Sequence, residues 1–233
     1  MYYRKYRPKN FKEVIGQEIV VKILKNIVKR GEILHGYLFA GERGTGKTTL
    51  ARIFAKAINC LNPQDGEACE NCKICKLWNE GKFLDLIEID AASHRKIDDV
   101  RNLQEHIGFK PLQGKYKVFI IDEAHMLTEE AFNALLKTLE EPPKHVVFIL
   151  ATTEPNKIPT TILSRLQRLD FKRISLPQIV EKLKIILENE KISYEEPALY
   201  LIAEEAEGSL RDAETLLEKI TISLDSKGSI TQD

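Results

Sequence analysis

Residues 41–48 constrain this chain more than any other stretch. They read Gly-Glu-Arg-Gly-Thr-Gly-Lys-Thr and fit the GxxxxGK[ST] pattern of a phosphate-binding loop. An apolar run at 36–40 precedes them, and apolar residues at helical spacing follow from Leu50 to Ile58. A buried strand, a glycine loop and a helix N-terminus form a phosphate cradle, because glycine lets backbone N–H groups converge on phosphate oxygens. The pattern predicts a nucleotide site; the alternative is a glycine-rich turn that fits by chance.

Two side chains of this loop carry specific expectations. Lys47 should contact the β- and γ-phosphates of the nucleotide, and the hydroxyl of Thr48 should bind Mg²⁺. The other predicted nucleotide-binding residues are Gly41, Glu42, Arg43, Gly44, Thr45, Gly46 and Thr49.

A second acidic signature follows a later apolar run. Residues 118–121, Val-Phe-Ile-Ile, lead into Asp122 and Glu123. Strand ends are where α/β sheets place their ligands, so we expect Asp122 to help hold Mg²⁺ and Glu123 to act as general base toward the attacking water. An acidic turn after a strand remains the alternative. The letters Asp-Glu-Ala-His at 122–125 also occur in helicases, but so short a string is weak evidence.

All four cysteines of the chain lie in one irregular stretch. Cys60, Cys69, Cys72 and Cys75 follow the spacing C-x8-C-x2-C-x2-C. This pattern suits tetrahedral Zn²⁺, and four thiolates leave no open position for a catalytic water, so the predicted site is structural. An iron–sulfur cluster, disulfides or unliganded thiols are the alternatives.

The hydrophobic pattern predicts an α/β fold. Apolar runs at 36–40, 85–89, 117–121 and 146–150 alternate with helical periodicity at 19–28, 50–58, 97–107 and 132–139. Continuous apolar strands alternating with helices indicate a parallel sheet covered on both faces. From Leu176 onward the pattern is helical, with segments at 179–187, 198–206 and 210–222. We therefore expect a nucleotide-binding α/β domain at 1–173, with a cysteine insertion at about 60–80, and a three-helix domain at 174–233.

Composition excludes some classes of protein. Among 233 residues, 35 Lys and Arg balance 35 Asp and Glu, which argues against a polycation that coats nucleic acid but allows a local basic patch. No apolar run approaches the roughly 20 residues of a membrane span. The first eight residues hold no apolar segment of a signal peptide, so a cytoplasmic protein is expected.

Further motifs follow the last predicted strand. A hydroxyl pair at Thr152 and Thr153 ends that strand, Arg165 follows Ser164, and residues 208–213 read Gly-Ser-Leu-Arg-Asp-Ala, with the arginine at 211. By themselves the threonines fit strand capping as well as phosphate sensing, and lone arginines are usually surface charges. The order of all these motifs resembles the AAA+ ATPases and, more narrowly, the gamma/tau (DnaX) subunits of the bacterial DNA polymerase III clamp loader. Stretches at 4–8, 14–18, 88–93 and 133–143 support the resemblance.

The resemblance assigns roles to residues of this chain. Thr153 corresponds to the first sensor, and Arg211 to the second sensor, which touches phosphates in its own subunit. Arg165 corresponds to the arginine finger, which acts in trans on ATP of a neighbouring subunit. The family's adenine-pocket segment matches Arg7, Pro8, Val14 and Ile15. The implied cofactors are ATP/ADP, Mg²⁺ and a structural Zn²⁺.

The resemblance also implies partners and a function. The partners are delta- and delta-prime-type subunits, copies of the chain, the sliding clamp and primer-template DNA, without a membrane. ATP binding and hydrolysis would open and load the clamp, and no polymerase activity is expected in this chain. His94, Arg95 and Lys96, at a predicted helix start, are candidate phosphate contacts or an ordinary solvated helix end. We expect the family's C-terminal collar domain to be absent, and Leu166 departs from the family's Ser-Arg-Cys.

Two other functions compete with this interpretation. An AAA+ branch-migration or unwinding helicase would move along DNA alone, but the cysteine insertion and the lack of a winged DNA-binding module argue against it. A nucleotide-gated scaffold would bind ATP without hydrolysis, but the intact Lys47, Thr48, Asp122 and Glu123 argue against that.

Overall fold

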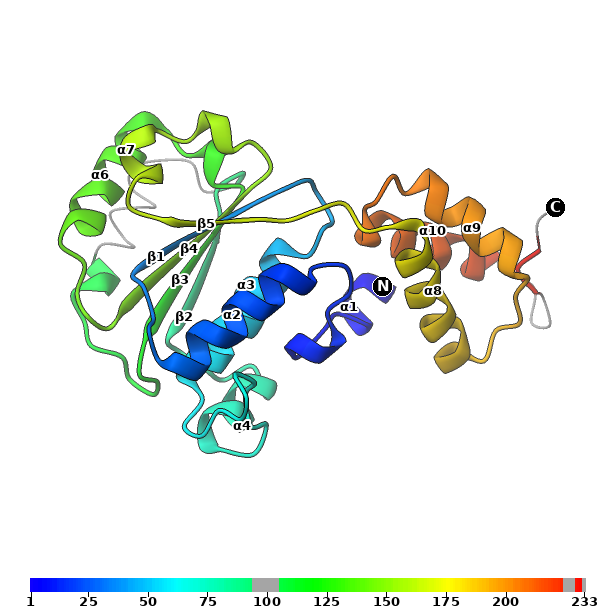
Figure 1. The fold of residues 1–233 in the computed structure, drawn as a ribbon, viewed down its shortest axis with the longest axis horizontal. Helices are drawn as coiled ribbons and strands as arrows, with labels where there is room; N and C mark the ends of the chain where they lie inside the picture. The colour runs from blue at the N-terminus through cyan, green and yellow to red at the C-terminus, as the bar shows by residue number, and fades with distance from the viewer. Residues whose placement is uncertain (94–104, 224–228, 232–233) are drawn as a thin grey trace. The chain divides into compact units, whose positions relative to one another are not determined.

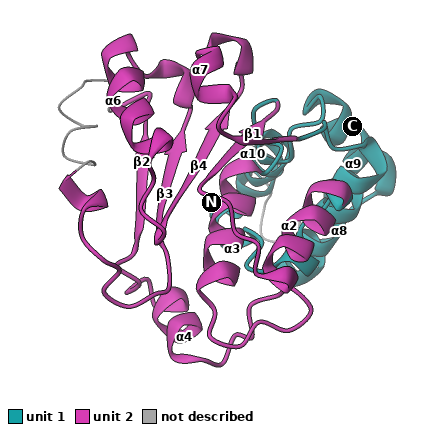
Figure 2. Ribbon diagram, turned by 60° about the vertical axis from the view of Figure 1, so that its left-hand side comes forward, with its two compact units in different colours: residues 1–18, 42–46, 171–233 teal, residues 19–41, 47–170 magenta. Residues whose placement is uncertain are grey.

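A computed structural model describes residues 1–93, 105–223 and 229–231. The chain divides into two compact units, coloured separately in Figure 2. Unit 1 comprises residues 1–18, 42–46 and 171–233, and unit 2 comprises residues 19–41 and 47–170. The predicted division at 173/174 stays a prediction.

Unit 2 is built on a parallel sheet, as predicted, and the sheet has five strands. The strands are β1 (Gly36–Ala40), β2 (Leu86–Asp90), β3 (Lys117–Asp122), β4 (Val146–Thr152) and β5 (Gln167–Asp170), in the spatial order β2-β3-β4-β1-β5. The three central strands β3, β4 and β1 are almost wholly buried, which explains why they read as unbroken apolar runs rather than alternating ones.

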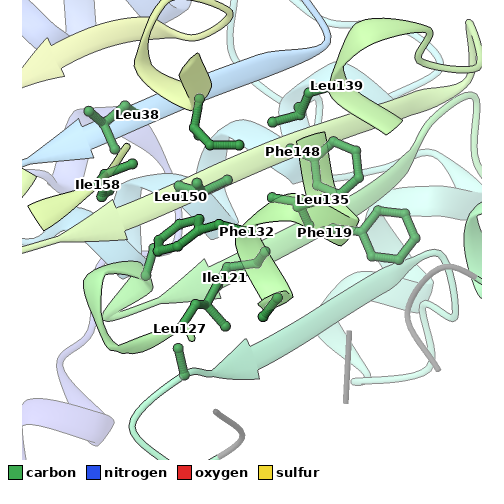
Figure 3. Close-up of a cluster of buried hydrophobic side chains, with 14 of the residues drawn as sticks. Leu38, Phe119, Ile121, Leu127, Phe132, Leu135, Leu139, Phe148, Leu150 and Ile158 are labelled. Atoms are coloured by element: carbon green, nitrogen blue, oxygen red, sulfur yellow. The ribbon is translucent and has the colours of Figure 1, made fainter. Parts of the chain in front are cut away.

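Helices cover both faces of this sheet (Figure 1). The helices α2 (Glu18–Arg30) and α3 (Lys47–Asn59) lie on one side, and α6 (Glu129–Glu140) and α7 (Thr160–Leu163) lie on the other. On the first side the Tyr37 and Phe54 rings meet edge to face at 5.0 Å. On the second, Phe119 and Phe148 stack at 5.3 Å in a buried cluster that includes Leu135 (Figure 3). The short helix α4 (Lys73–Asn79) follows α3, within the cysteine segment.

One strand and several short helices are not predicted by the sequence pattern. The edge strand β5 carries polar or charged residues at three of its four positions, and only Leu169 is buried, so it lacks the apolar run that marked the other strands. The helices α1 (Tyr2–Lys5), α4 and α7 span seven residues or fewer, too short to show a helical period. Most of the expected helix at 97–107 lies outside the described residues. The candidate contacts His94, Arg95 and Lys96 lie wholly outside them.

Unit 1 contains the predicted three-helix module. Its helices are α8 (Leu176–Glu190), α9 (Glu196–Glu205) and α10 (Leu210–Ser223). Their apolar faces share one core around Leu183, Leu199 and Leu217. The N-terminal segment packs on the same core through Tyr2, Tyr6 and Ile15.

Short 3-10 turns occur in the chain at Phe11–Glu13, Ala124–Met126 (η2) and Pro155–Lys157.

No helix among the described residues is long and apolar enough to cross a membrane.

The core beneath α6 gives a first test. Leu135 is fully buried there, so we expect Leu135→Ala to lower the free energy of unfolding by about 2–5 kcal/mol, through lost burial and a residual cavity. Leu84 is 61% exposed, and Leu84→Ala should change the free energy of unfolding by less than about 0.5 kcal/mol. Urea titration of both variants measures the difference, and equal effects would contradict the assigned packing.

Candidate functional site

The glycine loop lies between β1 and α3. Gly44 and Gly46 adopt φ values of 76° and 97°, which residues with a Cβ rarely reach. The Lys47 side chain is almost fully buried, and its ammonium donates to the carbonyl of Gly41 at 2.8 Å. The ammonium therefore folds back along the loop that is predicted to hold phosphates. Thr49 lies half-buried in the first turn of α3.

Thr48 and Asp122 come together although they are far apart in sequence. The Thr48 hydroxyl donates to Asp122 Oδ2 at 2.7 Å, and Asp122 Oδ1 accepts the Glu123 N–H at 3.0 Å. A hydroxyl and a carboxylate are hard oxygen donors of the kind that Mg²⁺ prefers, so the pair fits the predicted metal.

Glu123 follows β3 in a left-handed conformation, with φ of 47°. Such a conformation costs a non-glycine residue about 1–3 kcal/mol and often occurs at functional sites. Glu123 Oε2 accepts the Thr153 hydroxyl at 3.1 Å. The structure thus brings the predicted base and the predicted first sensor into contact.

Thr152 has a different environment from Thr153. It is fully buried, and its hydroxyl lies 2.9 Å from Nδ1 of His125. No role for His125 is predicted from the sequence, because the four letters at 122–125 are too short to be specific. The alternation of side chains along a strand end separates the two threonines, with Thr153 toward Glu123 and Thr152 toward His125.

The four cysteines form one cluster. Their sulfur atoms all lie within 4.8 Å of one another, and Cys60 Sγ lies 3.9 Å from Cys72 Sγ and 3.8 Å from Cys75 Sγ. Four sulfurs at about 2.3 Å from a tetrahedral Zn²⁺ would be about 3.8 Å apart. The separations far exceed the roughly 2.05 Å of a disulfide bond, so all four thiols are free. The donor set fits a structural zinc, and it also suits an iron–sulfur cluster.

A buried lysine joins this cluster to the helix that follows the phosphate loop. Lys56 of α3 is 2% exposed, and its ammonium donates to both carboxylate oxygens of Glu70, at 2.7 and 2.5 Å. Asn79 Oδ1 accepts a third bond at 2.9 Å. Glu70 lies between Cys69 and Cys72, so the cysteine segment supplies the carboxylate that binds this ammonium.

Arg165, the predicted finger, lies at the end of α7. Its guanidinium donates to Glu140 Oε1 at 3.0 Å and to the Thr161 carbonyl at 2.6 Å. The neighbouring Leu166 packs against the sheet core, and a Cβ on Gly36 would overlap its side chain. The larger residue in place of the family cysteine is therefore accommodated by a glycine in β1.

Within unit 1, residues 42–46 of the loop contact the helical module. The Gly44 carbonyl accepts the Leu210 N–H at 3.2 Å, and Glu42 pairs with Arg173 at 2.7 Å. Glu42 and Arg43 are exposed, and Thr45 is buried. This part of the loop is thus bonded to the first turn of α10.

The predicted second sensor lies on the same helix, near the N-terminal segment. The Arg211 guanidinium lies 4.9 Å from the centre of the Tyr3 ring. Beside Arg7, the buried Glu214 and Lys182 form a charged group, and the Lys182 ammonium donates to the Tyr6 carbonyl at 2.9 Å. Pro8 and Val14, also predicted near adenine, are half-buried.

Comparisons with known proteins identify the family of this chain. Residues 16–175 match a family model described as DNA polymerase III, delta subunit, and residues 178–220 match the ATPase lid domain of a DNA polymerase III clamp loader subunit. The tau subunit of Bacillus subtilis is 51% identical over 93% of this chain and 38% of its own length. The chain belongs to the DNA polymerase III gamma/tau (DnaX) family.

Other relatives extend the comparison. The gamma/tau subunit of Mycoplasma genitalium is 52% identical over 99% of this chain and 39% of its own length, and the tau subunit of Escherichia coli is 49% identical over 97% and 35%. The chain therefore spans about two fifths or less of these relatives. The structure of the Thermotoga maritima RuvB Holliday junction branch migration motor is similar in fold, with a TM-score of 0.69 and 24% identity over 93% of this chain and 65% of that one. That likeness shows that this member of the gamma/tau family has the AAA+ fold.

Metal removal tests the cysteine cluster. We expect one Zn²⁺ per chain by elemental analysis, and a lower thermal midpoint after chelation, because the cysteine segment loses its cross-link. Glu70→Gln should release zinc to a chelator faster, since the buried Lys56 ammonium loses its carboxylate partner. The exposed pair of Glu80 and Lys82 offers a control, Glu80→Gln, which should behave as wild type. Bound iron with visible absorbance would contradict the zinc assignment.

Glu214 predicts a pH dependence of stability. Burial raises the pKa of its carboxyl from 4.5 to about 7, and the positive charges of Lys182 and Arg7 oppose the rise. Between these two pH values the folded chain binds more protons than the unfolded chain, so the contribution of Glu214 is complete below pH 4.5 and is lost as the pH rises through 7. Glu214→Gln should flatten this part of the stability profile in urea titrations. The exposed Glu204→Gln should not, and an unchanged slope in Glu214→Gln would refute the assignment.

Proposed function

We propose that this chain is an ATP-driven motor subunit of a DNA polymerase III clamp loader, which loads a sliding clamp on primed DNA. One observation supports this best: two hydrogen bonds meet where the neighbouring parallel strands β3 and β4 end. Thr48 bonds Asp122 at 2.7 Å, and Thr153 bonds Glu123 at 3.1 Å. That arrangement supplies a hard-cation site beside an oriented carboxylate. Ligand sites of α/β sheets occur at this edge.

The proposed chemistry divides the work among these residues. The Lys47 ammonium would turn from the Gly41 carbonyl to phosphate oxygens, and Thr48 and Asp122 would hold Mg²⁺. When bound, the metal neutralises charge on the transferred phosphoryl group. Glu123 would accept a proton from the attacking water, while the Thr153 hydroxyl holds its carboxylate in place.

Arginines would make the reaction depend on conformation and assembly. We propose that Arg211 contacts the phosphates of its own subunit, and that Arg165 leaves Glu140 to contact ATP in a neighbouring subunit. Arg7, Pro8, Val14 and Ile15 would contribute to the adenine pocket. The proposed domains are 1–173 and 174–233, and the proposed partners are delta- and delta-prime-type subunits, further copies, the clamp and primer-template DNA.

ATP hydrolysis by the assembled complex tests this function. The full-length subunit is mixed with its delta-type partners, with and without sliding clamp and primed DNA. We expect clamp and DNA to stimulate turnover, and Arg165→Ala to lower it by about 10³–10⁵-fold, because the finger stabilises charge in the transition state. Lys47→Ala should lose nucleotide binding and clamp loading together.

Different outcomes would separate the competing functions. Turnover indifferent to the clamp would contradict a clamp loader and favour another AAA+ motor. Tight ATP binding without turnover in wild type would favour a scaffold. Arg168→Ala is a matched control, because Arg168 is an exposed arginine of the nearby edge strand that pairs with Asp170 at 2.8 Å. Its turnover should match wild type.

A further inference from the structure

His125 lies next to the proposed base but outside every role assigned above. It belongs to the turn η2, directly after β3, and only 7% of its side chain is exposed. Its Nδ1 lies 2.9 Å from Thr152 Oγ1 and 3.5 Å from Glu123 Oε2. Its Nε2 lies 3.5 Å from Glu154 Oε1. Both ring nitrogens thus face polar groups in an environment with little access to solvent.

These contacts join the ends of two neighbouring strands, β3 and β4. The Thr152 hydroxyl also accepts the Glu154 N–H at 3.0 Å, so it fixes the turn that follows β4. His125 and Glu123 come from the end of β3, whereas Thr152, Thr153 and Glu154 come from the end of β4. The buried bond between the imidazole and Thr152 is therefore a cross-link between the segment of the base and the segment of the sensor.

The carboxylate of Glu123 needs such support. Its side chain is 31% exposed, so packing alone does not hold it, and its backbone is in a left-handed conformation. Its Oε2 lies between the Thr153 hydroxyl and the His125 ring. A general base must stay within hydrogen-bond reach of the water that it deprotonates, and a displacement of about 1 Å can cost about 100-fold in rate.

We propose that His125 is a positioning residue for ATP hydrolysis: its bond to Thr152 holds the end of β4 against the segment that carries Glu123, and so orients the Glu123 carboxylate. The inference rests on the proposed function. His125 itself touches neither nucleotide nor water in this role. It acts through Thr152 and Glu123, and it should affect the chemical step rather than the binding of ATP.

The test measures kcat and KM for ATP in the full-length subunit assembled with its partners, clamp and primed DNA. His125→Ala should lower kcat by about 10–100-fold, the cost of a misplaced base, with KM within about threefold of wild type. His125→Asn should recover most of the rate, because its side-chain amide can occupy the position of Nδ1 beside Thr152. His35→Ala is the matched control, an exposed histidine at the opposite end of the sheet, and should leave kcat unchanged.

A second variant removes the same bond from the other side. Thr152→Val keeps the shape of the side chain and should lower kcat as His125→Ala does. The double variant should have a kcat only slightly below that of the slower single variant, because the two single changes remove the same contact. If His125→Ala fails to fold, Thr152→Val and His125→Asn carry the test.

Three results would overturn the inference. They are wild-type kcat in His125→Ala or in Thr152→Val, an Asn variant as slow as the Ala variant, and a loss of ATP affinity as large as the loss of kcat. A wild-type complex that does not hydrolyse ATP would contradict the proposed function and this inference together. An active wild type with an equally active His125→Ala would contradict this inference alone.

Discussion

The register of the parallel sheet is the constraint on which the candidate site depends. Ala40 of β1 lies opposite Thr152 of β4, and Ile121 of β3 lies opposite Leu150 of the same strand. The three central strands therefore end at one edge, where the chain supplies Thr48, Asp122, Glu123 and Thr153. A slip of one residue would turn the core side chains of a strand to the other face and move its polar end away from the others. Burial of both faces strongly disfavours such a slip.

Burial also explains how polar groups at this edge are organised. Thr152 is fully buried at the end of an apolar strand, so its hydroxyl needs partners, and it finds them in His125 and the Glu154 N–H. Thr153, one residue on, points to the other side and reaches Glu123. The polar network thus has a buried part that joins strands and a more exposed part that contains the proposed base. In the proposed mechanism, the buried part holds the exposed part in position.

The cysteine segment is organised around a buried positive charge, the ammonium of Lys56. Lys56 points from α3 into this segment, where Glu70 and Asn79 bind its ammonium. An unpaired buried ammonium would be costly, so the segment and the helix stabilise each other only when both are folded. Because α3 begins at Lys47, the cysteine cluster supports the helix that carries the phosphate loop. The insertion thereby helps to hold the helix that follows the glycine loop.

Much of this protein could be predicted from its sequence by itself. Local patterns sufficed for the glycine loop, the four apolar strands, the three helices after Leu176 and the cysteine cluster, because burial and ligand spacing leave a direct trace in residue order. Short or polar elements left no such trace: β5 is held by pairing with β1 rather than by its own composition. Only the tertiary structure decided that His125 contacts Thr152, that Lys56 meets Glu70, and which threonine faces Glu123. Those facts depend on the sheet register and on side-chain direction at strand ends, which long-range packing determines.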